Sequence, residues 1–232
     1  MRSIPWESPP YIFINSIAEF FGGDKAEVAI FAGFCYNGEH QEKERMDKIM
    51  SEVCVFLADG FEEIEGLTVV DLLRRAGIET RTVSIMGQEE IQGAHGIIVK
   101  ADSMFENTDF SEVKMLVLPG GMPGTIHLKE HKGLEKLILK HNEEKKYLAA
   151  ICAAPTVFGG MGILKGKKAI CYPGMEEGLT GAEVTCQPAV TDGHITTSRG
   201  LGTAIDFALA LISELRDKES ADTISKQVVY ER

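Results

Sequence analysis

The chain has 232 residues and a formal net charge of -11 at pH 7, with 24 Lys and Arg against 35 Asp and Glu. This acidic balance argues against nucleic acid or an anionic membrane as the main partner, because both require a positively charged surface. No stretch approaches the roughly 20 apolar residues of a membrane span. The five cysteines include no CxxC pair and no Cys/His pairing. We therefore expect no metal site, no disulfide framework, and reduced thiols in a cytoplasmic protein.

Residues 1–49 differ from the rest of the chain, since their apolar fragments follow no sustained helical or strand period. They also lack the features of a secretory signal. Residues 42–45 directly precede Met46 and can all be encoded by purine-only codons, as a bacterial ribosome-binding site would be. We expect either a translation start at Met46 or Met50, or a poorly packed N-terminal arm before one domain at residues 50–232. Intact-mass measurement of the native protein distinguishes the two.

From residue 51 onward, short apolar runs alternate with amphipathic stretches. The runs predict strands and the stretches predict helices, by their periodicity and by the glycines and prolines that bound them. The predicted strands are residues 53–58, 79–85, 97–99, 115–118, 148–151, 168–171, 189–191 and 195–198. The predicted helices are residues 62–76, 133–144, 155–161 and 202–215, the last being the final helix. Residues 87–96 are predicted to form a hairpin-type excursion.

The alternation of strands with helices predicts an α/β domain with a single doubly wound, mostly parallel sheet and helices on both faces. Several of the strands are apolar throughout, which is typical of strands covered on both sides. Ligands of such folds bind outside the carboxyl ends of the strands. We therefore look for the functional residues where the predicted strands end.

The stretch from Leu148 to Thr156 changes at Cys152 from a buried strand to small residues, a proline and a helical pattern. This change predicts a nucleophile elbow, in which Ala150 and Ala154 are small because the backbone folds back on itself. A thiol near a helix N-terminus is expected to have a lowered pKa and to react as the thiolate. The alternative is a buried, inert structural cysteine.

Two further strands end in unusual residues, at Ala58-Asp-Gly-Phe-Glu-Glu-Ile-Glu65 and at Leu118-Pro-Gly-Gly121. In a parallel sheet these ends meet the Cys152 corner at one edge. Glycines let backbone N–H groups approach a ligand closely. The N–H groups of Gly120, Gly121 and Ala153 could therefore form an oxyanion hole for a carbonyl attacked by Cys152. The alternative for the two glycines is a plain turn.

Glu65 follows Ile64 in the helical repeat and so falls near the boundary between the buried and exposed faces of the predicted helix. A carboxyl group in a partly dry site beside Cys152 would have a raised pKa and could exchange a proton with the thiol. From the residues alone, a solvated helix position is the competing interpretation. Glu62 and Glu63 are expected to favour the helix N-terminus electrostatically.

Four stretches together resemble the ThiJ/PfpI superfamily, in the branch of the parkinsonism-associated deglycase. They are residues 58–65 (ADGFEEIE), 117–121 (VLPGG), 149–156 (AAICAAPT) and 197–203 (TSRGLGT). The resemblance implies a flavodoxin-like domain of the class I glutamine amidotransferase type, and a homodimer. It also implies that Cys152 is the nucleophile, that Glu65 hydrogen-bonds it, and that Gly121 and Ala153 supply the backbone donors.

The chain departs from the family pattern at two positions. Peptidase-like and amidotransferase-like members have a histidine after the nucleophile or elsewhere in a triad, where this chain has Ala153, so a general base is missing there and we expect neither activity. The deglycase branch often has a histidine before a proline where this chain has Tyr172 before Pro173. Tyr172, with Gly120, is a candidate substrate contact. Of the six histidines, His127 is a weak site candidate and the others are expected at the surface or in turns.

These features predict a cofactor-free enzyme of the glyoxalase or protein deglycase type. Its substrates would be methylglyoxal-like dicarbonyls or their early adducts, attacked by the Cys152 thiolate with Glu65 as the acid/base. The alternative function is a redox-responsive chaperone or oxidative-stress sensor that uses the same oxidisable cysteine with little turnover.

Overall fold

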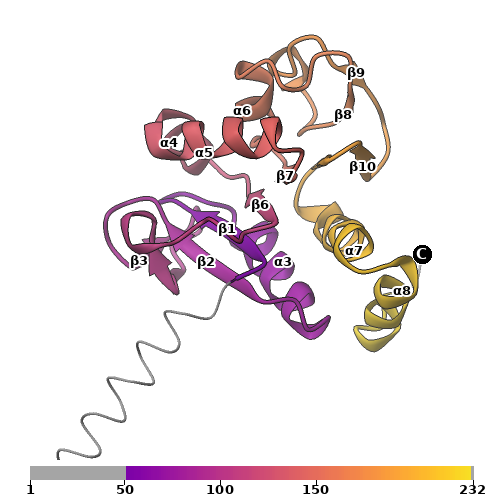
Figure 1. Cartoon of the computed structure of the whole chain (residues 1–232), viewed down its shortest axis with the longest axis horizontal. Helices are drawn as coiled ribbons and strands as arrows, with labels where there is room; N and C mark the ends of the chain where they lie inside the picture. The colour runs from indigo at the N-terminus through magenta and orange to yellow at the C-terminus, as the bar shows by residue number, and fades with distance from the viewer. Residues whose placement is uncertain (1–50, 231–232) are drawn as a thin grey trace, which may run out of the picture. The chain divides into compact units, whose positions relative to one another are not determined.

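The computed structural model describes residues 51–230 (Figure 1), so the expectations for residues 1–49 lie outside the described residues. Its main sheet has seven strands in the order β10-β11-β7-β6-β1-β2-β5. The neighbours are parallel except for the antiparallel pair β10 and β11. The strands are β1 (Val53–Leu57), β2 (Thr80–Ser84), β5 (Ser103–Met104), β6 (Met115–Leu118), β7 (Tyr147–Ile151), β10 (Ala189–Asp192) and β11 (Ile195–Ser198). The predicted mostly parallel sheet is confirmed.

Helices cover both faces of this sheet, as alternate side chains of β1 show. Val53, Val55 and Leu57 pack into one core with three of the helices, whereas Cys54 and Phe56 pack into a second core on the other face. Burial on both faces favours apolar side chains at every position, which explains the continuous apolar run of β1. The first core contains α3 (Glu63–Arg75), α7 (Ala204–Leu215) and α8 (Lys218–Gln227), and the second contains α4 (Gly124–Glu130), α5 (Lys132–Glu143) and α6 (Pro155–Gly160).

Two small sheets lie outside the main one. The predicted hairpin is confirmed as β3 (Glu90–Gln92) paired antiparallel with β4 (Ile98–Lys100). The strand predicted at residues 168–171 is reduced to β8 (Lys168–Ala169), which pairs with β9 (Glu183–Val184). Two backbone N–H groups of residues 168–171 donate to side chains of the main sheet instead of to a neighbouring strand. The Lys168 N–H donates to Asp192 Oδ2 at 2.8 Å, and the Ile170 N–H donates to Thr197 Oγ1 at 2.9 Å.

The helix at residues 202–215 is confirmed as α7, but the prediction that it is the last helix is wrong. The helix α8 follows it, begun by Asp217, whose carboxylate accepts the Ser220 N–H at 2.7 Å. Ala221 and Ile224 are the buried positions of α8, so its apolar pattern is too sparse to predict. Single turns of 3-10 helix lie at η1 (Phe105–Asn107), η2 (Glu176–Gly178) and η3 (Leu201–Thr203). No helix within residues 51–230 has the length and apolar content needed to cross a membrane.

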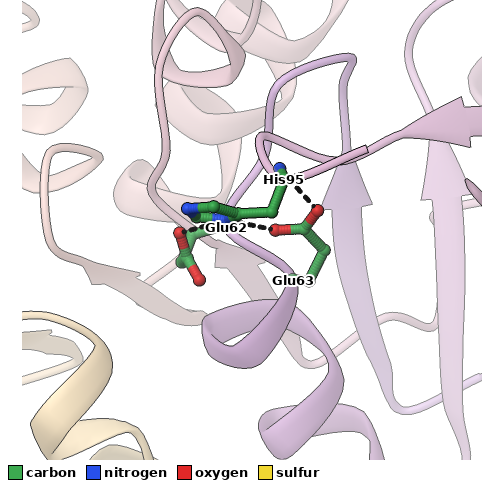
Figure 2. A group of neighbouring side chains, drawn as sticks. All are labelled: Glu62, Glu63 and His95. Carbon is green, nitrogen blue, oxygen red and sulfur yellow. Dashed lines mark hydrogen bonds and ion pairs between the residues drawn. The ribbon is translucent and has the colours of Figure 1, made fainter. Parts of the chain in front are cut away.

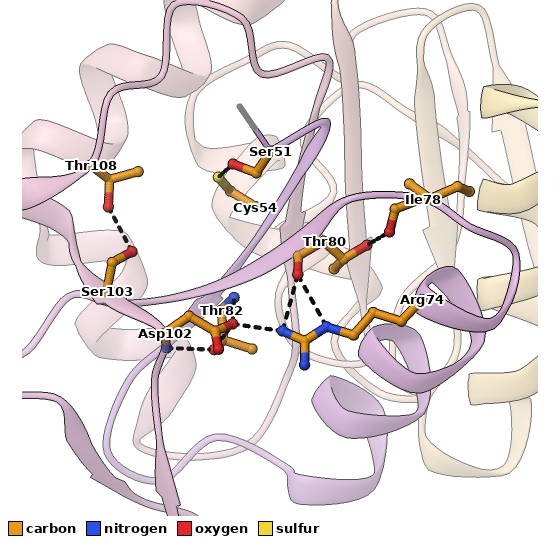
Figure 3. A network of polar contacts seen from close by, with 9 residues as sticks. All are labelled: Ser51, Cys54, Arg74, Ile78, Thr80, Thr82, Asp102, Ser103 and Thr108. Carbon is orange, nitrogen blue, oxygen red and sulfur yellow. Dashed lines mark hydrogen bonds and ion pairs between the residues drawn. The ribbon is translucent and has the colours of Figure 1, made fainter. Parts of the chain in front are cut away.

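A polar network fixes the C-terminal end of α3 against β2 and the edge strand β5 (Figure 3). The Arg74 guanidinium donates to Thr80 O at 3.0 and 3.1 Å and to Asp102 Oδ2 at 2.7 Å. The same Asp102 oxygen accepts the backbone N–H and the hydroxyl of Thr82, each at 2.8 Å. This network holds in place the helix whose first turn carries Glu65.

Candidate active site

Cys152 occupies the turn between β7 and α6 with a φ of 65°. This left-handed backbone conformation is costly for a residue with a side chain and typical of a nucleophile elbow. Hydrogen bonds hold the turn on both sides, from Cys152 N–H to Ser198 O at 3.0 Å and from Tyr172 N–H to Cys152 O at 2.8 Å. Pro155 begins α6, where its missing N–H has no cost. The turn therefore has the geometry predicted from the sequence.

Glu65 lies in the first turn of α3 and is only 1% exposed. Its carboxyl is hydrogen-bonded to the Cys152 side chain, to the Gly120 N–H at 3.0 Å and to the backbone of Leu201. The interpretation of Glu65 as a solvated helix residue is therefore wrong. Burial raises the pKa of Glu65 to about 7, against the opposing effect of these hydrogen bonds, and the nearby charge of Glu62 raises it further. This pKa suits proton exchange near neutral pH.

The thiol of Cys152 behaves differently from the sequence prediction. Burial, together with the charge and hydrogen bond of Glu65, raises its pKa to about 12. The expected lowering is contradicted, because burial and an adjacent carboxylate outweigh the backbone N–H groups of Ala153 and Gly121, which act in the opposite direction. The Cys152–Glu65 pair therefore loses one of its two protons near neutral pH and retains the other until strongly alkaline pH. A proton that moves from the sulfur to Glu65 removes the neighbouring negative charge and makes the thiolate accessible.

The predicted oxyanion donors are adjacent to the sulfur. The backbone N–H groups of Gly121 and Ala153 both hydrogen-bond Cys152. Gly121 has a φ of 94°, and a Cβ there would collide with the backbone of residues 60–62. A Cβ on Gly120 would lie 2.6 Å from Glu65 Oε2. Gly120, predicted as a substrate contact, thus has its N–H engaged by Glu65 and must be glycine for the carboxyl to fit.

Gly200 completes the site, and no role was predicted for it. A Cβ on Gly200 would lie 3.4 Å from Tyr172 Cδ2, 3.7 Å from Glu65 Oε1 and 3.8 Å from Cys152 Sγ. Gly200 follows β11, which pairs in parallel with β7 through Ser198 and Ile151. The carboxyl end of β11 is thus a fourth strand end at the site. In the sequence, the position of Gly200 just after the strand predicted at residues 195–198 was the feature that could have indicated this role.

The remaining candidates are placed as follows. Tyr172 is 52% exposed, and its ring borders Gly200 beside the sulfur. His127 lies on α4, and within residues 51–230 the contacts described for Cys152 and Glu65 do not include it. Among the described histidines, the expectation of a surface or turn position is wrong for His141, which is buried on α5, whereas His194 lies in the turn between β10 and β11, although it is buried there. His194 Nε2 pairs with Asn142 Oδ1 at 2.9 Å.

Glu62, Glu63 and His95 form a group of potential metal ligands next to the site (Figure 2). The Nδ1 atom of His95 lies 2.9 Å from Glu63 Oε2 and 3.4 Å from Glu62 Oε2. The His95 N–H also donates to Glu63 Oε1 at 2.8 Å. These contacts already satisfy the Glu63 carboxylate, so the group forms an ion-paired clamp between the hairpin and the start of α3.

An elbow cysteine beside a buried glutamate at the carboxyl edge of a parallel sheet defines a class of α/β proteins. The model of the DJ-1/PfpI family matches residues 51–214, and the chain belongs to this family. The resemblance inferred from the four stretches is thus confirmed.

Relatives span several kingdoms. Protein DJ-1 homolog B of Arabidopsis thaliana is 37% identical over 186 residues, which are 79% of this chain and 42% of that protein. The chain likewise matches 47% of homolog A, and so spans less than half the length of these two relatives. A deglycase of Pyrococcus abyssi is 34% identical over 63% of this chain and 89% of its own length. The structure of oxidized Toxoplasma gondii DJ-1 is 34% identical with a TM-score of 0.76, covering 79% of this chain and 100% of that one.

Proposed function

We propose that this protein is a cofactor-free enzyme of the glyoxalase or deglycase type, acting on methylglyoxal-like dicarbonyls or their early adducts with amines and thiols. The observation that carries the proposal is the hydrogen-bonded pair of Cys152 and Glu65, with the Gly121 and Ala153 N–H groups at the sulfur. These groups supply a nucleophile, an acid/base and an oxyanion site. The deglycase named among the relatives supports the same class of reaction.

The reaction begins with the attack of the Cys152 sulfur on the aldehyde carbon. The thiol proton passes to Glu65 as the S–C bond forms, and Glu65 passes it on to the former carbonyl oxygen to give a hemithioacetal, which leaves Glu65 as a carboxylate. The N–H groups of Gly121 and Ala153 stabilise the charge on that oxygen during the attack. Glu65 then takes a proton from the attacked carbon and returns it to the neighbouring carbon, while the hydroxyl proton moves to the neighbouring oxygen, and the hemithioacetal becomes a thioester. Water hydrolyses the thioester to a hydroxy acid and regenerates the thiol, so that methylglyoxal plus water becomes lactate.

The neighbours of the pair argue against a peptidase or amidotransferase. Ala153 follows the nucleophile where a triad histidine would stand, and Glu65 is the acid/base that contacts the sulfur. Tyr172 can offer its hydroxyl to a bound substrate as a hydrogen-bond donor or acceptor.

Lactate formation from methylglyoxal tests the proposal. We expect Cys152→Ser to abolish turnover and Glu65→Gln to lower it strongly, with both variants folded by circular dichroism. Cys186→Ser is the matched control, because Cys186 is an exposed free thiol, and it should keep wild-type activity. A Cys152→Ser variant that still forms lactate at the wild-type rate would overturn the assignment of the nucleophile.

A redox-responsive chaperone or sensor is the second candidate function. It is favoured by the partial exposure of Cys152 beside a carboxyl group that, when protonated, can donate a hydrogen bond to a sulfinate. Mass spectrometry after mild peroxide treatment should show selective oxidation of Cys152 under either function. Catalytic consumption of dicarbonyl occurs only under the first.

We further propose a cytoplasmic homodimer. The described cysteines Cys54, Cys152, Cys171 and Cys186 carry free thiols, which a reducing compartment would preserve. Ile64 on α3 and Ile97 and Ile98 on the hairpin are exposed large apolar side chains, and their burial would favour association through this region. Sedimentation equilibrium of the wild type and of Ile98→Glu measures the dissociation constant of the dimer, which the substitution should raise. A wild type that is monomeric at micromolar concentrations contradicts the dimer.

A further inference from the structure

The segment that follows β11 returns to the reactive sulfur at Gly200. The Ser198 carbonyl at the end of β11 accepts the Cys152 N–H at 3.0 Å, which ties the strand to the elbow. Gly200 then has a φ of 156° and a ψ of -168°, a backbone conformation that is essentially restricted to glycine. Such a conformation persists only where the surrounding structure holds it. The conformation of Gly200 therefore depends on its neighbours.

The Thr203 hydroxyl supplies this restraint. Its Oγ1 donates to the Gly200 carbonyl at 2.9 Å and accepts the Gly200 N–H at 3.2 Å, so one side chain bonds both backbone polar groups of the glycine. The same oxygen lies 2.8 Å from Ser198 Oγ, which donates to Pro188 O at 2.7 Å. Ser198 is fully buried, so its hydroxyl needs these partners. The two hydroxyls thus close residues 198–203 into one hydrogen-bonded loop.

This loop places Gly200 directly beside the reactive pair. A Cβ on Gly200 would lie 3.8 Å from Cys152 Sγ and 3.7 Å from Glu65 Oε1, and it would lie 3.4 Å from Tyr172 Cδ2. These are contact distances, so the point that a Cβ would occupy is bordered by all three side chains. Because glycine has no Cβ, this space beside the sulfur stays open. An aldehyde carbon that Sγ attacks can enter it.

The two sides of the Gly200 segment differ in the room that they leave. Toward the sulfur, the gap left by the missing Cβ is closed by the three bordering side chains. On the other side, the Leu201 side chain is 50% exposed, and a Cβ on Gly202 would meet no atom within 4 Å. A segment released from Thr203 would therefore move outward, and the space beside Sγ would widen.

We propose that Thr203 is a positioning residue of the active site, whose hydroxyl holds Gly200 and thereby sets the width of the space beside Cys152 Sγ. Within residues 51–230, the hydrogen bonds described for the Thr203 side chain reach Ser198 and Gly200 and not Cys152 or Glu65, so Thr203 acts through Gly200. The use of this space by a dicarbonyl rests on the proposed function, whereas its width does not.

Alkylation of Cys152 by two reagents of different size measures this width without any substrate. The rate constants for small iodoacetamide and bulkier N-ethylmaleimide, followed by mass spectrometry of the Cys152 peptide, form the Cys152 alkylation profile. Both reagents react with the thiolate, so at one pH the ratio of their rate constants cancels the thiolate fraction and reports access. Thr203→Val removes only the hydroxyl. We expect it to raise the ratio of N-ethylmaleimide to iodoacetamide by roughly two- to tenfold, the factor that one ordinary hydrogen bond represents.

Three further variants separate the hydroxyl from a general loosening of the fold. Thr203→Ser keeps the hydroxyl and should retain the wild-type ratio. Ser198→Ala removes the other hydroxyl of the loop and should raise the ratio, which keeps the test decisive if Thr203→Val fails to fold by circular dichroism. Thr191→Val is the matched control, because Thr191 and Thr196 form a second hydroxyl pair, at 2.9 Å, across the same two strands.

The Thr191→Val control should have the wild-type ratio. The proposal is overturned by a ratio that stays unchanged or falls when either loop hydroxyl is removed. It is equally overturned by a ratio that rises in Thr191→Val, or that Thr203→Ser fails to retain.

Methylglyoxal kinetics connect the space to the reaction. Thr203→Val should raise KM by a similar factor, roughly two- to tenfold, and leave kcat within about twofold, because contacts with the substrate weaken while Cys152 and Glu65 are unchanged. Equal KM values for Thr203→Val and the wild type would overturn the link to the substrate. If the alkylation ratios change as expected but the wild type fails to turn over dicarbonyls, the proposed function alone is wrong.

Discussion

Replacing Glu65 with glutamine should stabilise the fold at alkaline pH while removing the proton acceptor of Cys152. The folded-state pKa of Glu65 is about 7, against an ordinary value of 4.5. Between these values the folded protein keeps a proton that the unfolded chain has lost. The stability that this proton confers is complete below pH 4.5 and is lost as the pH rises through 7. Glutamine has nearly the same shape, can accept the Gly120 N–H and carries no charge.

The shift of about 2.5 units corresponds to about 3 kcal/mol, at 1.36 kcal/mol per unit. Glu65→Gln should therefore gain up to about 3 kcal/mol over the wild type between pH 4.5 and pH 8. Urea unfolding of both proteins at pH 5 and pH 8 measures most of this difference, with Glu89→Gln as the control for loss of a carboxylate. Equal pH dependence of the wild type and Glu65→Gln would refute the buried titration. The same variant should lose activity, so stability and function would change in opposite directions.

Two further substitutions test the supporting structure. Gly120→Ala would place a Cβ 2.6 Å from Glu65 Oε2, so we expect the Cys152 alkylation profile to change and lactate formation to fall at least tenfold. A variant with the wild-type profile would show that the turn can move away from Glu65. Arg216 pairs with Glu52 at 2.6 Å, and hydrogen bonds from Arg216 and then Lys114 lower the pKa of Glu52 to about 2. Arg216→Ala should destabilise the protein by about 1 kcal/mol at pH 7, and in denaturant titrations this difference should shrink as the pH falls from 4.5 toward 2. A difference that stays constant down to pH 2 would contradict the ion pair as its source.

Local patterns were enough to predict the elements that build the site. β1, β6 and β7 are apolar throughout because helices cover both sides of the sheet, so each run shows in the sequence. The Cys152 corner is visible because an elbow demands small residues and a helix start immediately after a strand. α8 was missed because its buried positions are only Ala221 and Ile224, and it is stabilised by packing on α7. β5 was missed because it has two residues, held at the sheet edge by pairing with β2 and by the Asp102 contacts that precede it.

The sequence by itself determined that one parallel sheet brings Cys152, the Gly120-Gly121 turn and the start of α3 to the same edge, since strand direction follows from the alternation of elements. Only the tertiary structure decided the protonation chemistry there. The burial of Glu65 depends on the chain segments at Gly120, Leu201 and Cys152, which come from three distant parts of the sequence. The Cys152 thiol pKa is raised because that burial and the Glu65 charge act together. The pairing of His95 with Glu63 likewise joins a hairpin to a helix 32 residues away. A pKa depends on every charge and dipole within several ångströms, and a sequence pattern does not encode those distances.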